Sequence, residues 1–106
     1  YTQNHKTTRE KVTLGVSYSS DIELVTTLLM SVAESQKGIL KSPKPFVLFD
    51  DFGDSALIFS IHFSVNDSFA DPKLKSELRY KIAAVFKTNQ ISIPFPQRDV
   101  HLFKHS

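Results

Sequence analysis

The fold is decided by residues 57–65, which read Leu-Ile-Phe-Ser-Ile-His-Phe-Ser-Val. Large apolar side chains occupy every second position from Leu57 to Val65. Successive side chains of a β-strand point to opposite faces of its sheet, so this alternation predicts a strand with one face in the core. The other face carries Ile58, Ser60 and His62 and is predicted to be the more polar side of a central strand.

A second strand is predicted immediately before this one. Residues 46–49 read Phe-Val-Leu-Phe, a short continuous apolar run that is typical of a buried strand. Residues 50–55 read Asp-Asp-Phe-Gly-Asp-Ser and supply the Asp and Gly residues that tolerate tight turns. Two strands that are joined by such a turn form a β-hairpin.

Apolar residues at helical spacing predict one helix on either side of this hairpin. The first helix begins at a capping box of Ser20 and Glu23, and Gly38 is placed to end it. The second begins with Asp71 as its cap and Pro72 in its first turn, and ends at residues 89–90. The predicted apolar stripes are Ile22, Val25, Leu28, Leu29, Val32 and Ala33 in the first helix, and Leu74, Leu78, Ile82, Val85 and Phe86 in the second.

Two further strands complete the predicted fold. Residues 11–18 alternate strictly, with Val12, Leu14, Val16 and Tyr18 on one face. Residues 91–93 are interpreted as a short strand closed by Pro94, because proline cannot donate a ladder hydrogen bond. The order β-α-β-β-α-β predicts an α+β, ferredoxin-like sandwich, a four-stranded antiparallel sheet with two helices on one face. We expect a linker over residues 1–8, this domain over 9–97, and a short extended strand or tail over 98–106.

Composition limits the functions that the chain can have. Its 106 residues suit one small domain, and 41% hydrophobic with 23% charged residues argue against disorder. The absence of cysteine excludes disulfides and thiolate chemistry. A formal net charge of +2 with no visible basic patch argues against a nucleic-acid partner. No apolar run approaches the roughly 18 residues that span a bilayer.

No catalytic, cofactor or metal site is expected. Residues 51–53 spell the Asp-Phe-Gly tripeptide of kinases, but the chain is too short to hold the other kinase motifs. Asp50, Asp51 and Asp54 could gather round a hard cation such as calcium, but the chain has no matching twelve-residue loop with a closing Glu. They are therefore interpreted as solvated turn carboxylates. The pattern around His101 and His105 predicts an extended segment, in which residues four apart would lie about 13 Å apart, too far to share one ion. The chain is therefore not expected to be an enzyme.

Two alternative roles concern the central strand. His62 is interpreted as a polar-face or interface residue, with pH sensing as the alternative. RNA-recognition domains with this element order stack bases on exposed aromatic residues of their central strands. Here Phe59 and Phe63 fall on the predicted core face, and the opposite face offers no stacking platform. RNA binding is therefore not expected.

Three segments resemble one known family. Residues 91–101, Ile-Ser-Ile-Pro-Phe-Pro-Gln-Arg-Asp-Val-His, resemble the segment that closes MscS-type (small-conductance) mechanosensitive ion channels. Residues 16–21, Val-Ser-Tyr-Ser-Ser-Asp, resemble the end of that family's first strand, and residues 45–55 resemble its hairpin. The resemblance covers about residues 9–102. One departure is Gln90, where the family often has glycine.

The resemblance implies the cytoplasmic C-terminal domain of a bacterial inner-membrane channel, with membrane helices and a β-domain upstream of Tyr1. It implies a heptameric homo-oligomer whose cage below the pore filters solutes and transmits strain during osmotic shock. It also implies that the last strand joins an axial barrel with its neighbours. The alternative is a small-ligand-binding regulatory domain of ferredoxin-like, ACT type, since such units often bind metabolites between paired sheets.

A subunit interface is predicted on two parts of the domain. The predicted residues are Ile58, Ser60, His62, Pro94, Phe95 and Pro96. The first three lie on the sheet face away from the helices, where small and semi-polar side chains suit contact with a neighbouring copy. The last three form a stiff, extended exit from the domain, because proline fixes its own φ and keeps the preceding residue extended.

Overall fold

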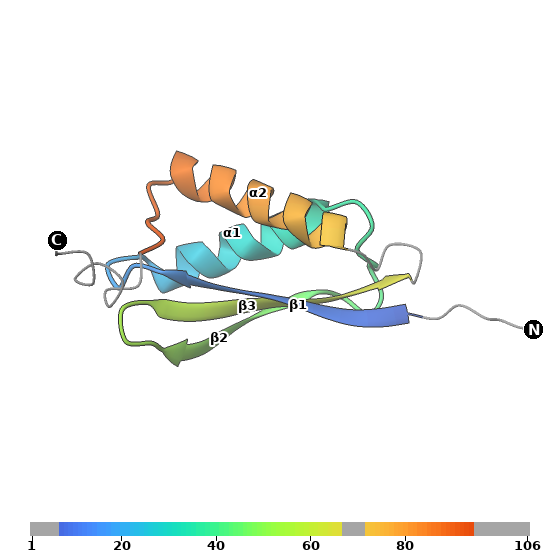
Figure 1. Ribbon diagram of the computed structural model, residues 1–106, viewed down its shortest axis with the longest axis horizontal. Coiled ribbons are helices and arrows are strands. Elements are labelled where there is room, and N and C mark those ends of the chain that lie inside the picture. Colours follow the sequence, from blue (N-terminus) through green and yellow to red (C-terminus); the bar gives the residue numbers. More distant parts are fainter. Residues whose placement is uncertain (1–6, 67–71, 95–106) are drawn as a thin grey trace, which may run out of the picture.

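The computed structural model describes residues 7–66 and 72–94. Its elements are β1 (Thr7–Val16), α1 (Ile22–Ser35), β2 (Phe46–Phe52), β3 (Leu57–Asn66) and α2 (Pro72–Thr88). The strands form an antiparallel sheet in the order β1-β3-β2, and both helices cover one face of it (Figure 1). This is the predicted α+β class, with the predicted strand at residues 57–65 in the centre of the sheet.

The two pairings of β3 differ in regularity. β1 pairs with β3 without a break from Thr7 opposite Asn66 to Val16 opposite Leu57. β2 pairs with β3 through a register shift between Phe49 and Asp51. The hairpin turn is shorter than predicted, because β2 continues to Phe52 and the turn is closed by a hydrogen bond from Gly53 N–H to the Ala56 carbonyl at 2.7 Å.

The prediction that residues 46–49 form a buried strand is wrong in its burial. Phe46, Leu48 and Phe49 are exposed, and Val47 is half-buried. The physical reason is the position of β2 at the edge of the sheet, where it has a neighbouring strand on one side only. A continuous apolar run does not distinguish a central strand from an edge strand that another surface covers.

α1 begins one residue later than the predicted capping box. Its N-cap is Asp21, whose Oδ1 accepts hydrogen bonds from the backbone N–H groups of Glu23 at 3.0 Å and Leu24 at 3.2 Å. The predicted cap Ser20 therefore does not hold this helix end. α1 closes at Gln36, and Gly38 follows it with a φ of 99°, a left-handed conformation that glycine adopts without strain.

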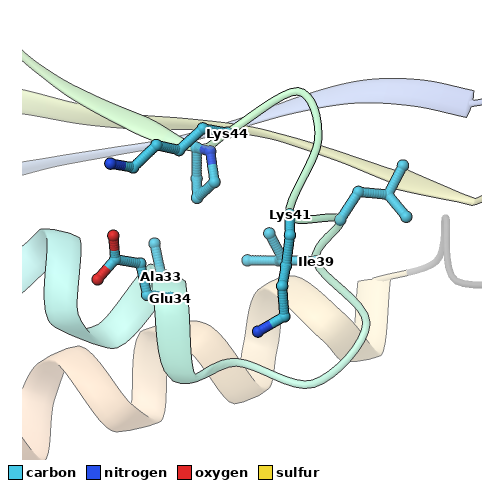
Figure 2. Close-up of a pocket in the computed structure, with 7 residues that line it drawn as sticks. Ala33, Glu34, Ile39, Lys41 and Lys44 are labelled. Atoms are coloured by element: carbon cyan, nitrogen blue, oxygen red, sulfur yellow. The ribbon is translucent and has the colours of Figure 1, made fainter.

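The loop between α1 and β2 is fastened at several points. The Leu40 N–H donates to the Ser64 carbonyl at 2.9 Å, and Ile39 forms an isolated bridge with Val65. At the helix end, the Gln36 side-chain amide donates to Glu77 Oε1 of α2 at 3.1 Å. Figure 2 shows the loop leaving α1, passing Ile39 and returning toward the sheet. These contacts hold the loop against the end of β3.

α2 begins at Pro72, as predicted; its predicted cap Asp71 lies outside the described residues. Its last turn is a Schellman motif, in which Ile91 N–H donates to the Phe86 carbonyl at 2.8 Å and Gln90 N–H donates to the Lys87 carbonyl at 3.2 Å. Gln90 has a φ of 60°, the conformation that this motif usually assigns to glycine. The turn thus forms although the residue carries a Cβ.

Within the described residues, 91–93 form no ladder, so the four-stranded part of the prediction is not shown. The described segment makes one backbone hydrogen bond to the strand layer, from Ser17 N–H to the Ser92 carbonyl at 2.8 Å. Only three residues separate the Gln90 turn from Pro94, which has no N–H to donate. The described sheet therefore has three strands, with residues 91–93 lying beside the end of β1.

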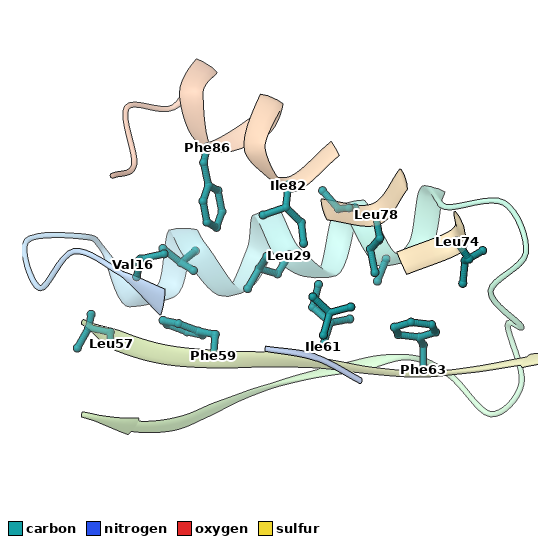
Figure 3. Packing of buried hydrophobic residues seen from close by; sticks show 14 of the residues in the cluster. Val16, Leu29, Leu57, Phe59, Ile61, Phe63, Leu74, Leu78, Ile82 and Phe86 are labelled. Carbon is teal, nitrogen blue, oxygen red and sulfur yellow. The ribbon is translucent and has the colours of Figure 1, made fainter. Parts of the chain in front are cut away.

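The core lies between the sheet and the two helices (Figure 3). Every second residue of β3 from Leu57 to Val65 is buried, which confirms the face predicted from the sequence. The helices contribute the buried residues Val25, Leu29, Val32 and Ala33 from α1, and Leu74, Leu78, Ile82 and Phe86 from α2. Two residues of the predicted apolar faces, Ile22 and Tyr18, are exposed and lie outside this core. Ile22 occupies the first turn of α1, and Tyr18 follows the end of β1.

Candidate subunit interface

On the outer face of the sheet, away from the helices, the predicted residues of β3 are buried or half-buried. Ser60 is fully buried although it lies on this face, and its Oγ lies 2.8 Å from His62 Nε2. Ile58 is half-buried, because its side chain lies over two glycines. A Cβ on Gly53 would lie 3.1 Å from Ile58 Cδ1, and one on Gly15 would lie 3.6 Å from it. The predicted residues Ile58, Ser60 and His62 therefore form the floor of this face.

The most exposed apolar groups of this face come from β2. Phe46 pairs with His62 and Leu48 pairs with Ser60, so both side chains stand on the outer face beside the floor. Phe46 is 39% exposed and Leu48 is 45% exposed. Sequence reasoning missed both residues, because it placed the whole 46–49 run in the core. The available signal was the β-alternation within that run, which puts Phe46 and Leu48 on the opposite face from Val47 and Phe49.

Aromatic and cationic groups gather at one end of this face. The rings of Phe46 and His62 stack with centroids 4.8 Å apart and planes 7° from parallel. The guanidinium carbon of Arg9, on β1, lies 5.9 Å from the centroid of Phe46. A guanidinium within about 6 Å of an aromatic ring is attracted by the ring's quadrupole. This arrangement fixes the orientation of Phe46 at the surface.

A second exposed apolar group lies at the hairpin end of the sheet. Phe49 packs on Phe59 with ring centroids 5.1 Å apart, and Phe52 meets Phe49 edge-on at 5.0 Å. Phe52 is nevertheless 66% exposed. The Tyr18 hydroxyl donates to the Gly53 carbonyl and joins the end of β1 to the hairpin turn. β2 therefore presents apolar side chains on both faces of the sheet.

The predicted exit segment is described only in part. Pro94 is half-buried, and Phe95 and Pro96 lie outside the described residues. The turn carboxylates that were the alternative calcium site lie at the surface. Asp50, Asp51 and Asp54 are exposed, and residues 7–66 and 72–94 contain no group of three or more potential metal ligands. His101 and His105 lie beyond these ranges.

The structure assigns no catalytic arrangement to the described residues. The exposed features are an apolar edge strand and a sheet face with aromatic and cationic groups, which is the composition of a protein–protein contact. Within the same ranges, neither helix has the length and hydropathy that crossing a membrane requires.

Comparison with known proteins identifies the class of protein to which such a module belongs. Residues 10–93 match the family model described as "Mechanosensitive ion channel MscS, C-terminal". The chain therefore belongs to the MscS family of mechanosensitive ion channels and corresponds to its C-terminal domain. This is a family of channels and not of enzymes.

Particular relatives carry the same domain. The small-conductance mechanosensitive channel of Helicobacter pylori (strain UM084) is 35% identical over 86 residues, covering 81% of this chain and 31% of that protein. The mechanosensitive channel MscK of Escherichia coli (strain K12) is 34% identical over 96 residues, covering 91% of this chain and 9% of that protein. The crystal structure of Helicobacter pylori MscS in its closed state superposes with a TM-score of 0.79 at 34% identity, covering 84% of this chain and 35% of that one. The chain thus spans about a third or less of these relatives.

Proposed function

We propose that this chain is the cytoplasmic wall module of an oligomeric mechanosensitive channel in a bacterial inner membrane. Copies arranged as a heptamer form a cage below the pore, which filters solutes at its side openings and couples strain to gating. Membership in the MscS family supports this role. The observation that carries the oligomeric part is the exposure of β2 on the outer face of the sheet, where the other described residues leave Phe46 and Leu48 uncovered.

An uncovered edge strand makes a free protein prone to associate with other chains. An edge strand presents unpaired backbone N–H and C=O groups, which natural proteins protect with charges, bulges or a covering element. In β2 the charges and the register shift lie at Asp50 and Asp51, whereas residues 46–49 carry no charge. On the outer face of β2, Phe46 and Leu48 are both exposed, and exposed apolar patches mark interaction sites. We infer that a neighbouring copy covers this strand.

Aromatic residues and arginine are the groups that subunit contacts favour. Phe46, held by its stack with His62 and its contact with Arg9, is an ordered aromatic group of this type. Phe46 and Leu48 would then touch the neighbouring copy. The predicted interface residues Ile58, Ser60 and His62 would lie behind them and support the contact.

We also propose that residues 91–93 complete a four-stranded, ferredoxin-like sheet in the assembled channel. The hydrogen bond from Ser17 N–H to the Ser92 carbonyl lies at the free edge of β1, where the fourth strand of this topology belongs. In the assembled cage, residues 91–93 extend along β1. Pro94, with Phe95 and Pro96 after it, then directs the chain end toward the axial barrel.

The oligomeric part is tested by sedimentation velocity of the 106-residue chain over a wide concentration range. Leu48→Glu places a charge in the proposed contact, and Tyr80→Glu places the same charge on α2, where Tyr80 is 76% exposed. We expect the wild-type chain and the Tyr80→Glu variant to self-associate and the Leu48→Glu variant to stay monomeric. Circular dichroism confirms that both variants are folded. A monomeric wild-type chain, or equal loss of association in both variants, would refute the contact.

The channel part is tested in a polypeptide that carries this domain together with its membrane region. Patch recordings under rising suction measure the number of tension-gated channels per patch. We expect Leu48→Glu to lower that number and Tyr80→Glu to leave it unchanged. If the wild-type polypeptide passes no tension-gated current, the proposed channel role is wrong.

A further inference from the structure

A pocket of about 340 Å³ opens where α1 ends and the loop to β2 begins (Figure 2). Its apolar wall consists of Ala33, Ile39, Leu40 and Pro45. This volume falls in the range of about 300 to 1,000 Å³ that is typical of small-molecule sites. The pocket lies apart from the proposed subunit contact, because none of its lining residues belongs to β2 or to the outer face of β3.

The rim of the pocket carries charges of both signs. Glu34 stands in the last turn of α1, and Lys41 and Lys44 come from the loop (Figure 2). Within residues 7–66 and 72–94, none of these three side chains forms an ion pair or a hydrogen bond. The last turn of α1 has no basic residue, so Glu34 adds to the negative end of the helix dipole. The helix side therefore attracts a cation, and the loop side attracts an anion.

The pocket is held in shape by the contacts of the loop. Leu40 N–H is bound to the Ser64 carbonyl, and Ile39 is bridged to Val65. Ala33 belongs to the buried core, and Ile39 packs against that core. A site whose walls are already ordered loses little conformational entropy when a ligand enters it.

We propose that this pocket binds a small zwitterion with an apolar side chain, the chemical class of the aliphatic amino acids. The ligand's ammonium group lies at Glu34 and the end of α1, its carboxylate lies at Lys41 or Lys44, and its side chain covers the apolar wall. A simple anion would leave Glu34 without a partner, and a simple cation would leave the two lysines without one. The zwitterion is the class that uses both the acidic and the basic side of the rim.

The test is a titration of the ¹⁵N-labelled 106-residue chain, followed by amide chemical shifts, with L-leucine as the probe. Two analogues each lack one charge: leucinamide has no carboxylate, and 4-methylpentanoate has no ammonium group. We expect saturable shifts at residues 33–34 and 39–41 with leucine. Because an exposed ion pair contributes up to about 1 kcal/mol, each analogue should bind up to about fivefold more weakly.

Matched variants locate the binding. Glu34→Gln is expected to weaken leucine binding while leaving 4-methylpentanoate unaffected, and Lys41→Gln together with Lys44→Gln should weaken both. Lys87→Gln, which removes a single positive charge from the exposed side of α2, should change neither. Shifts that never saturate, equal affinity for leucine and 4-methylpentanoate, or equal effects of Glu34→Gln and Lys87→Gln would each overturn the proposal.

Discussion

Replacing Gln90 with glycine is expected to stabilise the chain. Among residues 7–66 and 72–94, Gln90 is the non-glycine residue with a positive φ, at 60°. A residue with a Cβ loses roughly 1–2 kcal/mol in this left-handed conformation, and glycine loses almost none. Glycine also gives the unfolded chain more freedom, which offsets about 0.4–1 kcal/mol of that gain. The balance is a stabilisation of about 0.5–1 kcal/mol.

Urea unfolding, followed by circular dichroism at the helical band, measures this change. Small proteins have slopes of about 1–3 kcal/mol per molar urea, so the unfolding midpoint should rise by roughly 0.2–1 M with an unchanged slope. The hydrogen bonds from the N–H groups of Gln90 and Ile91 should persist, since glycine retains its backbone amide.

Asn89→Gly is the matched control. Asn89 precedes the left-handed residue, and its side-chain amide donates to the Val85 carbonyl at 2.8 Å. Glycine there removes this bond and adds freedom to the unfolded chain, so the midpoint should fall. A midpoint that falls for Gln90→Gly, or rises equally for both variants, would refute the argument from the left-handed turn.

Three further predictions concern the described core and its surface. Asp21→Ala should lower the free energy of unfolding by about 1 kcal/mol because it removes the α1 cap, whereas Ser20→Ala should change it by less than half of that in the same urea assay. Phe59→Ala should cost about 3–5 kcal/mol because the ring is fully buried, and Tyr80→Ala should stay within about 0.5 kcal/mol in thermal unfolding. Lys75→Gln breaks a 3.0 Å ion pair with a partly exposed carboxylate of β1; the loss should stay below about 1 kcal/mol and shrink further in salt titrations.

Much of the fold follows from local patterns that the sequence displays directly. The alternation from Leu57 to Val65 is confirmed as the buried face of β3, and the spacing of Leu74, Leu78 and Ile82 is confirmed as the buried face of α2. These signals are reliable because a side chain's direction in a strand or helix depends on its own backbone, not on distant neighbours. The family motifs at residues 16–21, 45–55 and 91–101 likewise identified the family.

What the sequence could not predict depends on neighbours in space. Phe46 and Leu48 are apolar and exposed because β2 lies at the edge of the described sheet. A local sequence pattern does not reveal the order of strands in a sheet. Ser60 is polar and buried because it lies between Thr13 of β1 and Leu48 of β2, and its hydroxyl is hydrogen-bonded to His62. Ser20 and Asp21 are adjacent and both have side chains that can cap a helix, so the sequence alone does not identify Asp21 as the cap.

The central place of β3 has a consequence for the order in which the chain folds. β1 and β2 both pair with β3 and not with each other. Pairing β2 closes only residues 53–56, whereas pairing β1 closes residues 17–56, a loop about tenfold longer. Loop-closure entropy scales as (3/2)RT ln n, so the second closure costs about 2 kcal/mol more. The hairpin in the middle of the chain is therefore expected to assemble first, and β1 to dock late and detach early.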